Sequence, residues 1–230
     1  ALALGISAEG LVSFGFLDQN GEDFSINTRD YSEIAVDDSA YALAVTYFQT
    51  AAIELYPEAA NTAAAVALLQ YELETKSYYY NTSEGHRLVA EMMQDMWEEN
   101  LGFTIQVTNE EWALFQATRT DGDFYLARGG WLTDFMDPSG LLSIFDSNNA
   151  YNDPNFYNDD FDALLAAAQA TTDKKVHFEK LYDAQELFMG QMPIIPVYHY
   201  TDTMLVSDHL VDWGRSVLGT VDFSGARIVE

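Results

Sequence analysis

The feature that most constrains the fold of this chain is an alternation of strand-like and helical segments between residues 72 and 127. Residues 72–80, with three consecutive tyrosines, and residues 103–107 are typical of strands. A shorter helix is predicted at 110–119 and a buried strand at 124–127. The segment joining the first two strands carries an apolar stripe at helical spacing, formed by Leu88, Val89, Met92, Met93, Met96 and Trp97. Core packing is the favoured interpretation of this stripe over a partner-binding groove. Strand, helix, strand, helix, strand predicts a mostly parallel sheet flanked by helices, which is an α/β fold.

The remaining segments add helices around this pattern. Residues 1–4 resemble the end of a helix, and Ser7 is a candidate cap for a short helix through Val12. Residues 192–200 predict a strand whose prolines place its first part at a sheet edge. Residues 201–230 contain two short strand-like pieces, at 204–206 and 227–229. Helices are predicted at 38–55, 58–69, 138–145, 161–170 and 173–190, with Pro57 separating the first two.

Charge and composition exclude several classes of protein. The chain has 10 basic and 37 acidic residues, and its net charge is −27. Nucleic acid is therefore not expected as a partner, because binding it requires a basic surface. The absence of cysteine excludes disulfides, thiol catalysis and cysteine-ligated metals. No apolar run approaches the roughly 20 residues of a membrane-spanning helix. No signal peptide is visible and the chain opens as if inside a helix, so we expect a fragment of a longer protein.

Signals for enzymatic or metal chemistry are few. We find no glycine-rich phosphate loop, nucleophile elbow or His-Glu-x-x-His pair. The four histidines lack metal-ligand spacing, and His177 is interpreted as a surface residue. The Asp- and Asn-rich loop at 146–155 is a candidate calcium site, but its spacing does not match the calcium-loop pattern. We therefore expect no metal, no cofactor and no catalysis, with a carboxylate-dependent hydrolase as the alternative.

The loop that follows the predicted strand 124–127 is the best candidate for a binding site. Ligands of open α/β sheets bind beyond the carboxyl ends of the strands, where Arg128, Trp131 and Asp134 are expected. Asp134 stands among Trp131, Leu132 and Phe135, and a carboxylate in apolar surroundings requires a cation. Either Arg128 or the ammonium group of a ligand could supply that cation. The residues alone do not decide between the two.

Several motifs follow one another in an order that resembles a known family. They are Tyr80-Asn-Thr-Ser-Glu-Gly-His86, Asn109-Glu-Glu-Trp112, Ala127-Arg-Gly-Gly-Trp131, Asp134-Phe-Met-Asp-Pro138 and Pro193-Ile-Ile-Pro-Val-Tyr-His-Tyr200. Together they resemble the oligopeptide/dipeptide-binding family of extracytoplasmic solute-binding proteins that feed ABC importers. The resemblance covers residues 80–206 well and the rest loosely. Residues 14–73 do not align convincingly, and Ser7-Ala8 stand where the family usually has Asp-Arg.

The resemblance implies a particular organisation. It predicts a periplasmic-binding-protein-like lobe of the type II solute-binding fold, in the peptide-binding cluster. Residues 1–200 would form the C-terminal ligand-binding lobe, and residues 201–230 would return toward an N-terminal lobe that this chain lacks. The implied partners are a short peptide ligand, the membrane permease subunits of the importer and that N-terminal lobe. The implied location is extracytoplasmic, either in the periplasm or on the cell surface as a lipoprotein.

The resemblance also implies roles for individual residues. Asp134 would take the α-ammonium group of a peptide. Trp131 and Leu132, with Gly130, would lie in the segment whose backbone pairs with the peptide as an added strand. The pocket-lining positions would be Trp112 and Arg119, and the residues that meet the carboxylate of the peptide would be Arg128 and His86.

Three other functions remain as alternatives. The same scaffold could bind a nickel chelate, haem, a sugar or a pheromone, although Asp134 favours an amine-bearing ligand. A hydrolase using buried carboxylates is less favoured. A purely structural or interaction module would use the acidic surface as its contact.

Overall fold

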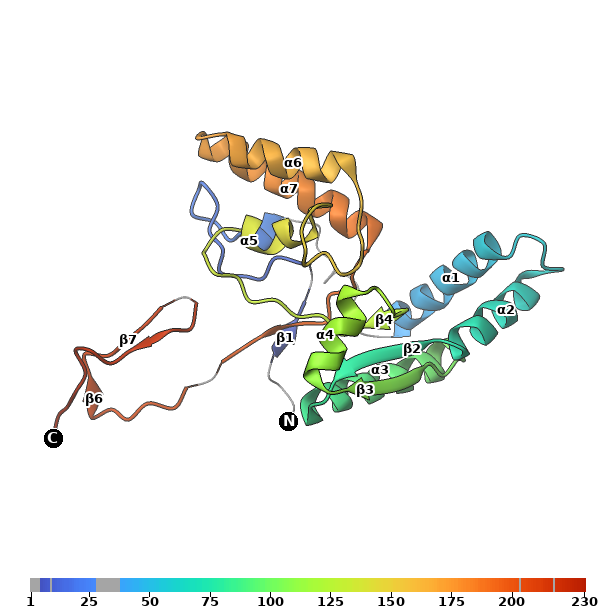
Figure 1. The fold of residues 1–230 in the computed structure, drawn as a ribbon, viewed down its shortest axis with the longest axis horizontal. Helices are drawn as coiled ribbons and strands as arrows, with labels where there is room; N and C mark the ends of the chain where they lie inside the picture. The colour runs from blue at the N-terminus through green and yellow to red at the C-terminus, as the bar shows by residue number, and fades with distance from the viewer. Residues whose placement is uncertain (1–4, 9, 28–37, 203, 217) are drawn as a thin grey trace. The chain divides into compact units, whose positions relative to one another are not determined.

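The computed structural model describes residues 5–8, 10–27, 38–202, 204–216 and 218–230 (Figure 1). The helix predicted at residues 1–4 lies outside these ranges. The chain divides into two compact units, one formed by Ala1–Tyr31 with Trp131–Glu230 and the other by Ser32–Gly130. The long central segment therefore forms one unit, and the two ends of the chain together form the other.

The central unit contains the predicted parallel sheet. Its strands are β2 (Ser77–Asn81), β3 (Gln106–Glu110) and β4 (Leu126–Ala127), in the order β3-β2-β4. All pairings are parallel, with Tyr78 opposite both Val107 and Leu126. Helix α3 (Glu84–Leu101) connects β2 to β3, and α4 (Trp112–Thr120) connects β3 to β4. The predicted alternation and the parallel sheet are confirmed.

The two connections cross the sheet in opposite directions, because β3 and β4 lie on opposite sides of β2. The usual right-handed crossover then places α3 and α4 on opposite faces of the sheet. Figure 1 shows α3 behind β2 and β3. Alternate strand residues Tyr78 and Tyr80 are buried in one cluster with Ala90 of α3, Phe103 and Ile105. Met92 and Met96 of the predicted stripe are instead exposed, so α3 packs through the side that carries Ala90.

Two helices precede the sheet, α1 (Asp38–Leu55) and α2 (Thr62–Glu74), and they lie side by side in Figure 1. Their separation near Pro57 is confirmed. The second helix begins at Thr62 rather than 58, because the Asn61 side chain caps it by accepting from Ala64 N at 3.0 Å. Small buried residues, Ala52 and Ala65, lie between the helices. The ring of Phe48 stacks on Phe103 at 5.7 Å and so joins α1 to the sheet cluster.

The other unit is mainly helical. Strand β1 (Gly5–Ser7) pairs antiparallel with β5 (Tyr198–Tyr200). A 3-10 turn η1 (Phe24–Asn27) precedes α5 (Ser139–Leu142), η2 (Ser143–Phe145), α6 (Asp159–Ala170) and α7 (Lys174–Gln191). The helix predicted to run from Ser7 through Val12 is wrong. Residues 5–7 find a partner strand nearly 200 positions away, and such long-range pairing outweighs local preference.

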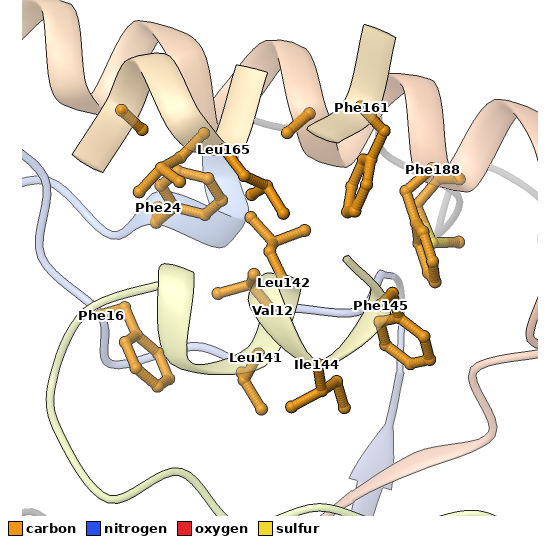
Figure 2. Packing of buried hydrophobic residues seen from close by; sticks show 14 of the residues in the cluster. Val12, Phe16, Phe24, Leu141, Leu142, Ile144, Phe145, Phe161, Leu165 and Phe188 are labelled. Carbon is orange, nitrogen blue, oxygen red and sulfur yellow. The ribbon is translucent and has the colours of Figure 1, made fainter. Parts of the chain in front are cut away.

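An apolar core holds this unit together. Phe24, Leu142, Phe161, Leu181 and Phe188 are fully buried in it. Figure 2 shows these segments converging, with Phe161 and Phe188 facing Leu142 and Phe145. The Phe188 ring lies 4.5 Å from Phe145, 5.3 Å from Phe156 and 5.6 Å from Phe161. Rings at these separations interact beyond their simple burial.

The last 30 residues form two short antiparallel strand pairs. They are β6 (Leu210–Val211) with β9 (Arg227–Ile228), and β7 (Gly214–Arg215) with β8 (Val221–Asp222). The predicted strand at 227–229 is confirmed for two residues. The one predicted at 204–206 is not formed.

Candidate functional site

At the carboxyl end of the parallel sheet, a polar group gathers around Asn81, the last residue of β2. The His86 ring lies on the first turn of α3, and its Nδ1 donates to Asn81 O at 3.2 Å. Arg128 directly follows β4, and its Nη1 lies 3.5 Å from Asn81 Oδ1. The Arg128 backbone N–H donates to Tyr79 O at 2.8 Å, which fixes this residue at the sheet edge. His86 and Arg128, the two residues predicted to meet the carboxylate of a peptide, therefore lie close together.

The electrostatics of this group suit an anion. Burial lowers the pKa of His86, and the positive charge of Arg128 lowers it further, against the opposing hydrogen bond to Asn81 O. A depressed pKa keeps the imidazole neutral at neutral pH, so Arg128 supplies the charge. An incoming carboxylate would favour the protonated form of His86.

Gly130, the last residue of the central unit, has no side chain and so leaves room for the Arg128 guanidinium. A Cβ atom at position 130 would lie 2.8 Å from Arg128 Nη2 and 3.3 Å from its Cζ. The guanidinium thus folds back over Gly130. Any side chain at position 130 would displace it.

Trp112 and Arg119, the predicted pocket residues, lie at opposite ends of α4. Trp112 is the first helical residue and is half exposed, with its ring 6.4 Å from Phe115. Arg119 lies about 10 Å further along the helix axis. Its guanidinium contacts the Phe115 ring and Gln116 Oε1. These contacts lie within α4, so they do not link Arg119 to the group around Asn81.

The segment 131–137 belongs to the other unit. Trp131 packs against Tyr151, with ring centroids 4.9 Å apart and planes 56° apart. Leu132 is 80% exposed. The Thr133 hydroxyl donates to Phe135 O at 3.0 Å, which closes a tight turn around Asp134. The contact of Trp131 with Tyr151 was not predicted. Tyr151 lies in the loop 146–155, which was interpreted only as a candidate calcium site.

Asp134 is at the tip of this turn and its side chain is exposed. Within the part of the chain that the structure describes, its carboxylate has no hydrogen-bond or ion-pair partner. The predicted apolar setting, which would demand a cation, is wrong. In the structure the carboxylate faces solvent, so that demand arises only when something covers it. Arg128 and Asp134 belong to different units of the chain.

The turn is anchored at Asp137, where α5 begins. Asp137 Oδ1 accepts from Ser139 N at 2.9 Å and from Ser139 Oγ at 2.5 Å. Its Oδ2 lies 2.9 Å from His177 Nε2. The interpretation of His177 as a surface residue is wrong, since its ring bridges two segments. No periodicity or motif predicts this contact between residues 40 positions apart.

Other candidate sites are weak. An open depression of about 350 Å³ beside the start of β2 is lined by Thr75, Lys76, Ser77, Tyr79, Gly122, Asp123, Phe124 and Tyr125, none of which was predicted as a site residue. Across the described residues, no three His, Asp or Glu side chains are grouped to hold a metal ion. In the loop 146–155, the side chain of Asn152 forms hydrogen bonds with the backbone N–H and carbonyl of Phe156. No described helix has the length and apolar character to cross a membrane.

Comparison with known proteins identifies the class. Residues 1–153 match the middle region of the bacterial extracellular solute-binding proteins, family 5. This match covers more than half of the chain. The chain therefore belongs to that family, as the ordered motifs predicted.

Individual relatives agree with this assignment. The chain is 38% identical over 132 residues to the oligopeptide-binding protein OppA of Bacillus subtilis, covering 57% of this chain and 24% of that protein. The periplasmic murein tripeptide-binding protein MppA, in its unliganded open form, shares 31% identity with a TM-score of 0.57, over 65% of this chain and 30% of that one. The pheromone receptor PrgZ matches 98% of this chain and 40% of its own at a TM-score of 0.71. Its 19% identity supports the fold alone. The predicted type II peptide-binding fold is thus confirmed, and the chain spans well under half the length of these relatives.

Proposed function

We propose that this chain is part of the substrate-binding component of an ABC importer and captures short peptides without chemical change. The observation that carries the proposal is the exposed carboxylate of Asp134, held at the tip of a hydrogen-bonded turn and free of protein partners among the described residues. Support comes from relatives whose names describe oligopeptide and murein tripeptide binding.

In this proposal each end of the peptide meets an opposite charge. Asp134 pairs with the α-ammonium group. The backbone of Gly130, Trp131 and Leu132 pairs with the peptide main chain as an added strand, which recognises peptides without regard to sequence. The carboxylate of the peptide meets Arg128 and His86, which the structure gathers around Asn81.

The rest of the machinery lies beyond this chain. A second lobe would close over the peptide by rotation about a hinge and exclude water. Residues 1–200 would form most of the C-terminal lobe, and residues 201–230 would return toward the other lobe. Permease subunits in the membrane would receive the peptide. The protein would work outside the cytoplasm, in the periplasm or as a surface lipoprotein.

The test is Asp134→Asn in the full-length protein, measured by calorimetry with a free-amino peptide and its N-acetylated counterpart. Losing one partner of a covered ion pair costs about 2–5 kcal/mol, so the free-amino peptide should bind at least ~30-fold more weakly. The acetylated peptide has no ammonium group and should change little.

A matched control is Asp95→Asn, which removes an exposed carboxylate from α3. It should leave both affinities unchanged. Equal losses for the two peptides in Asp134→Asn would contradict the role of Asp134. Turnover of a peptide that a carboxylate substitution abolishes would contradict the binding function altogether.

A further inference from the structure

One histidine ties the proposed ammonium-binding turn to the helical core. His177 lies on the first turn of α7 with 22% of its side chain exposed. Its Nδ1 is 2.8 Å from Ala168 O, near the end of α6. Its Nε2 is 2.9 Å from Asp137 Oδ2. A single ring thus joins α6, α7 and the segment that carries Asp134.

The chemistry of these contacts selects the charged form of the ring. A carbonyl and a carboxylate oxygen both accept hydrogen bonds, and only the imidazolium offers an N–H on both nitrogens. Ala168 O is also one of the last four carbonyls of α6, which have no partner inside the helix. The negative end of the helix dipole therefore faces the ring and adds to the attraction of Asp137.

Asp137 transmits this attachment to the turn. Through Oδ1 it binds the backbone and hydroxyl of Ser139, and its carbonyl accepts from Gly140 N at 2.9 Å. Thr133 and Phe135 then lie directly over Gly140, since a Cβ atom there would overlap Thr133 Oγ1 and would lie 3.2 Å from Phe135 Cζ. Asp134 sits between these two residues. Its position depends on the start of α5, and the start of α5 is tied to His177.

We propose that His177 is a positioning residue for the ammonium site: as an imidazolium it holds Asp137 and so fixes the turn that presents Asp134. Affinity for free-amino ligands then falls when His177 loses its proton. This inference rests on the proposed function, and it adds pH dependence to it.

The direction of the pH effect follows from the groups around the ring. Asp137 faces it from the turn, α6 contributes the Ala168 carbonyl, and the Phe178 ring of α7 meets it edge-on at 5.2 Å. Burial lowers the pKa of His177, but the bonds to Ala168 O and Asp137 outweigh it and raise the pKa above its ordinary value of 6.5. Because the pKa of His177 is higher in the folded than in the unfolded protein, its protonation stabilises the folded state fully at any pH below the unfolded-state pKa. This stabilisation is lost as the pH rises through the folded-state pKa.

The attachment itself can be tested without ligand in the full-length protein. Nuclear magnetic resonance of the His177 ring should give a pKa above 6.5. Asp137→Asn, which keeps the shape but removes the charge, should lower it. His177→Gln should speed amide exchange at Ser139 and Gly140 and leave exchange in α1 and α2 unchanged. An unshifted His177 titration in Asp137→Asn, or unchanged exchange in His177→Gln, would overturn the proposal.

The positioning role requires a binding measurement across pH. At pH about 6, His177→Gln should weaken a free-amino peptide roughly tenfold, as expected for one charge-assisted hydrogen bond, and the N-acetylated peptide less. The ratio of wild-type to variant affinity should fall toward one as pH rises above the folded-state pKa. Titration of the peptide amine and of His86 affects both proteins and cancels in this ratio.

His209→Gln is the matched control, because His209 binds Val229 O at the exposed end of the chain. A constant ratio across pH would show that His177 is merely structural and would overturn the positioning role. If the wild type binds no peptide, the proposed function fails, while the ring titration and the exchange still decide whether His177 holds the turn.

Discussion

At the scale of single residues, two glycines show how the site is shaped by missing side chains. Gly130 leaves space for the Arg128 guanidinium, and Gly140 leaves space for Thr133 and Phe135. The obstacles differ in kind. At position 130 the neighbour is the flexible end of an arginine, which can move away. At position 140 the neighbours are a short β-branched side chain and a ring that together define the turn.

Gly140→Ala should therefore lower the free energy of unfolding by about 1–3 kcal/mol, the usual cost of overpacking, and weaken free-amino peptides by displacing the turn. Chemical denaturation and calorimetry measure the two effects. Gly190→Ala is the control, because a Cβ atom there meets nothing within 4 Å inside α7. That change should be neutral or stabilising, since alanine favours helix. Wild-type stability in Gly140→Ala would contradict the packing described for the turn.

At the residue scale, the sequence predicts which side chains follow the ends of strands, because the alternation of strands and helices locates those ends. His86 and Arg128 lie at such positions, next to Asn81. Their roles, and that of Asp134, stay predictions. The contacts Asp137–His177 and Trp131–Tyr151 join segments 40 and 20 positions apart. No periodicity or turn signal encodes such pairs. They follow from how α7 and the loop 146–155 pack, which the sequence does not specify.

At the scale of elements, helix boundaries depend on side chains that cap them. Asn158 Oδ1 accepts from Asp160 N and Phe161 N, both at 3.0 Å, and so begins α6 two residues earlier than the apolar pattern predicts. Asp173 caps α7 in the same way. Apolar periodicity locates the buried face of a helix. It does not locate the first residue of the helix, because the residues next to the N-cap are polar and are not part of the apolar pattern.

Asn158→Ala should lower the free energy of unfolding by about 1 kcal/mol, the typical cost of a lost N-cap. Denaturant titration provides the measurement. Asn148→Ala is a suitable control, because Asn148 is exposed in the preceding loop and its bond to Asp146 Oδ1, at 2.9 Å, is donated by its backbone N–H and survives the substitution. A variant as stable as the wild type would show that water replaces the cap without cost.

The strands divide into those that the sequence predicted and those that it missed. β2, β3 and β4 are linked by helices of predictable length, so the alternation alone implies their parallel pairing. β1 pairs with β5 from the far end of the chain, and its residues carry no strand signal of their own. The strand predicted at 192–200 is formed only at 198–200 for a related reason. Its prolines lack the N–H groups that a ladder needs, and its partner strand has three residues.

At the scale of the whole molecule, the large negative net charge affects the stability of the folded state. The net charge of −27 leaves many carboxylates without nearby cations. Among the described residues, five ion pairs join side chains only three or four positions apart along the chain. Such exposed local pairs contribute little. Repulsion among the acidic groups therefore exceeds attraction and opposes the compact state.

The melting temperature should consequently rise with salt. At about 10 mM NaCl the screening length is about 30 Å, and at about 1 M it is about 3 Å, so salt removes the repulsion. Each kcal/mol regained should raise the melting temperature by roughly 2–4 °C in a protein of this size. Calorimetry at neutral pH measures this rise. Near the sequence pI of 4.1 the net charge vanishes, and the same salt series should have little effect. A melting temperature that falls with salt at neutral pH would show that attractive pairs outweigh the repulsion. A rise of equal size at both pH values would point to water exclusion by salt instead of screening.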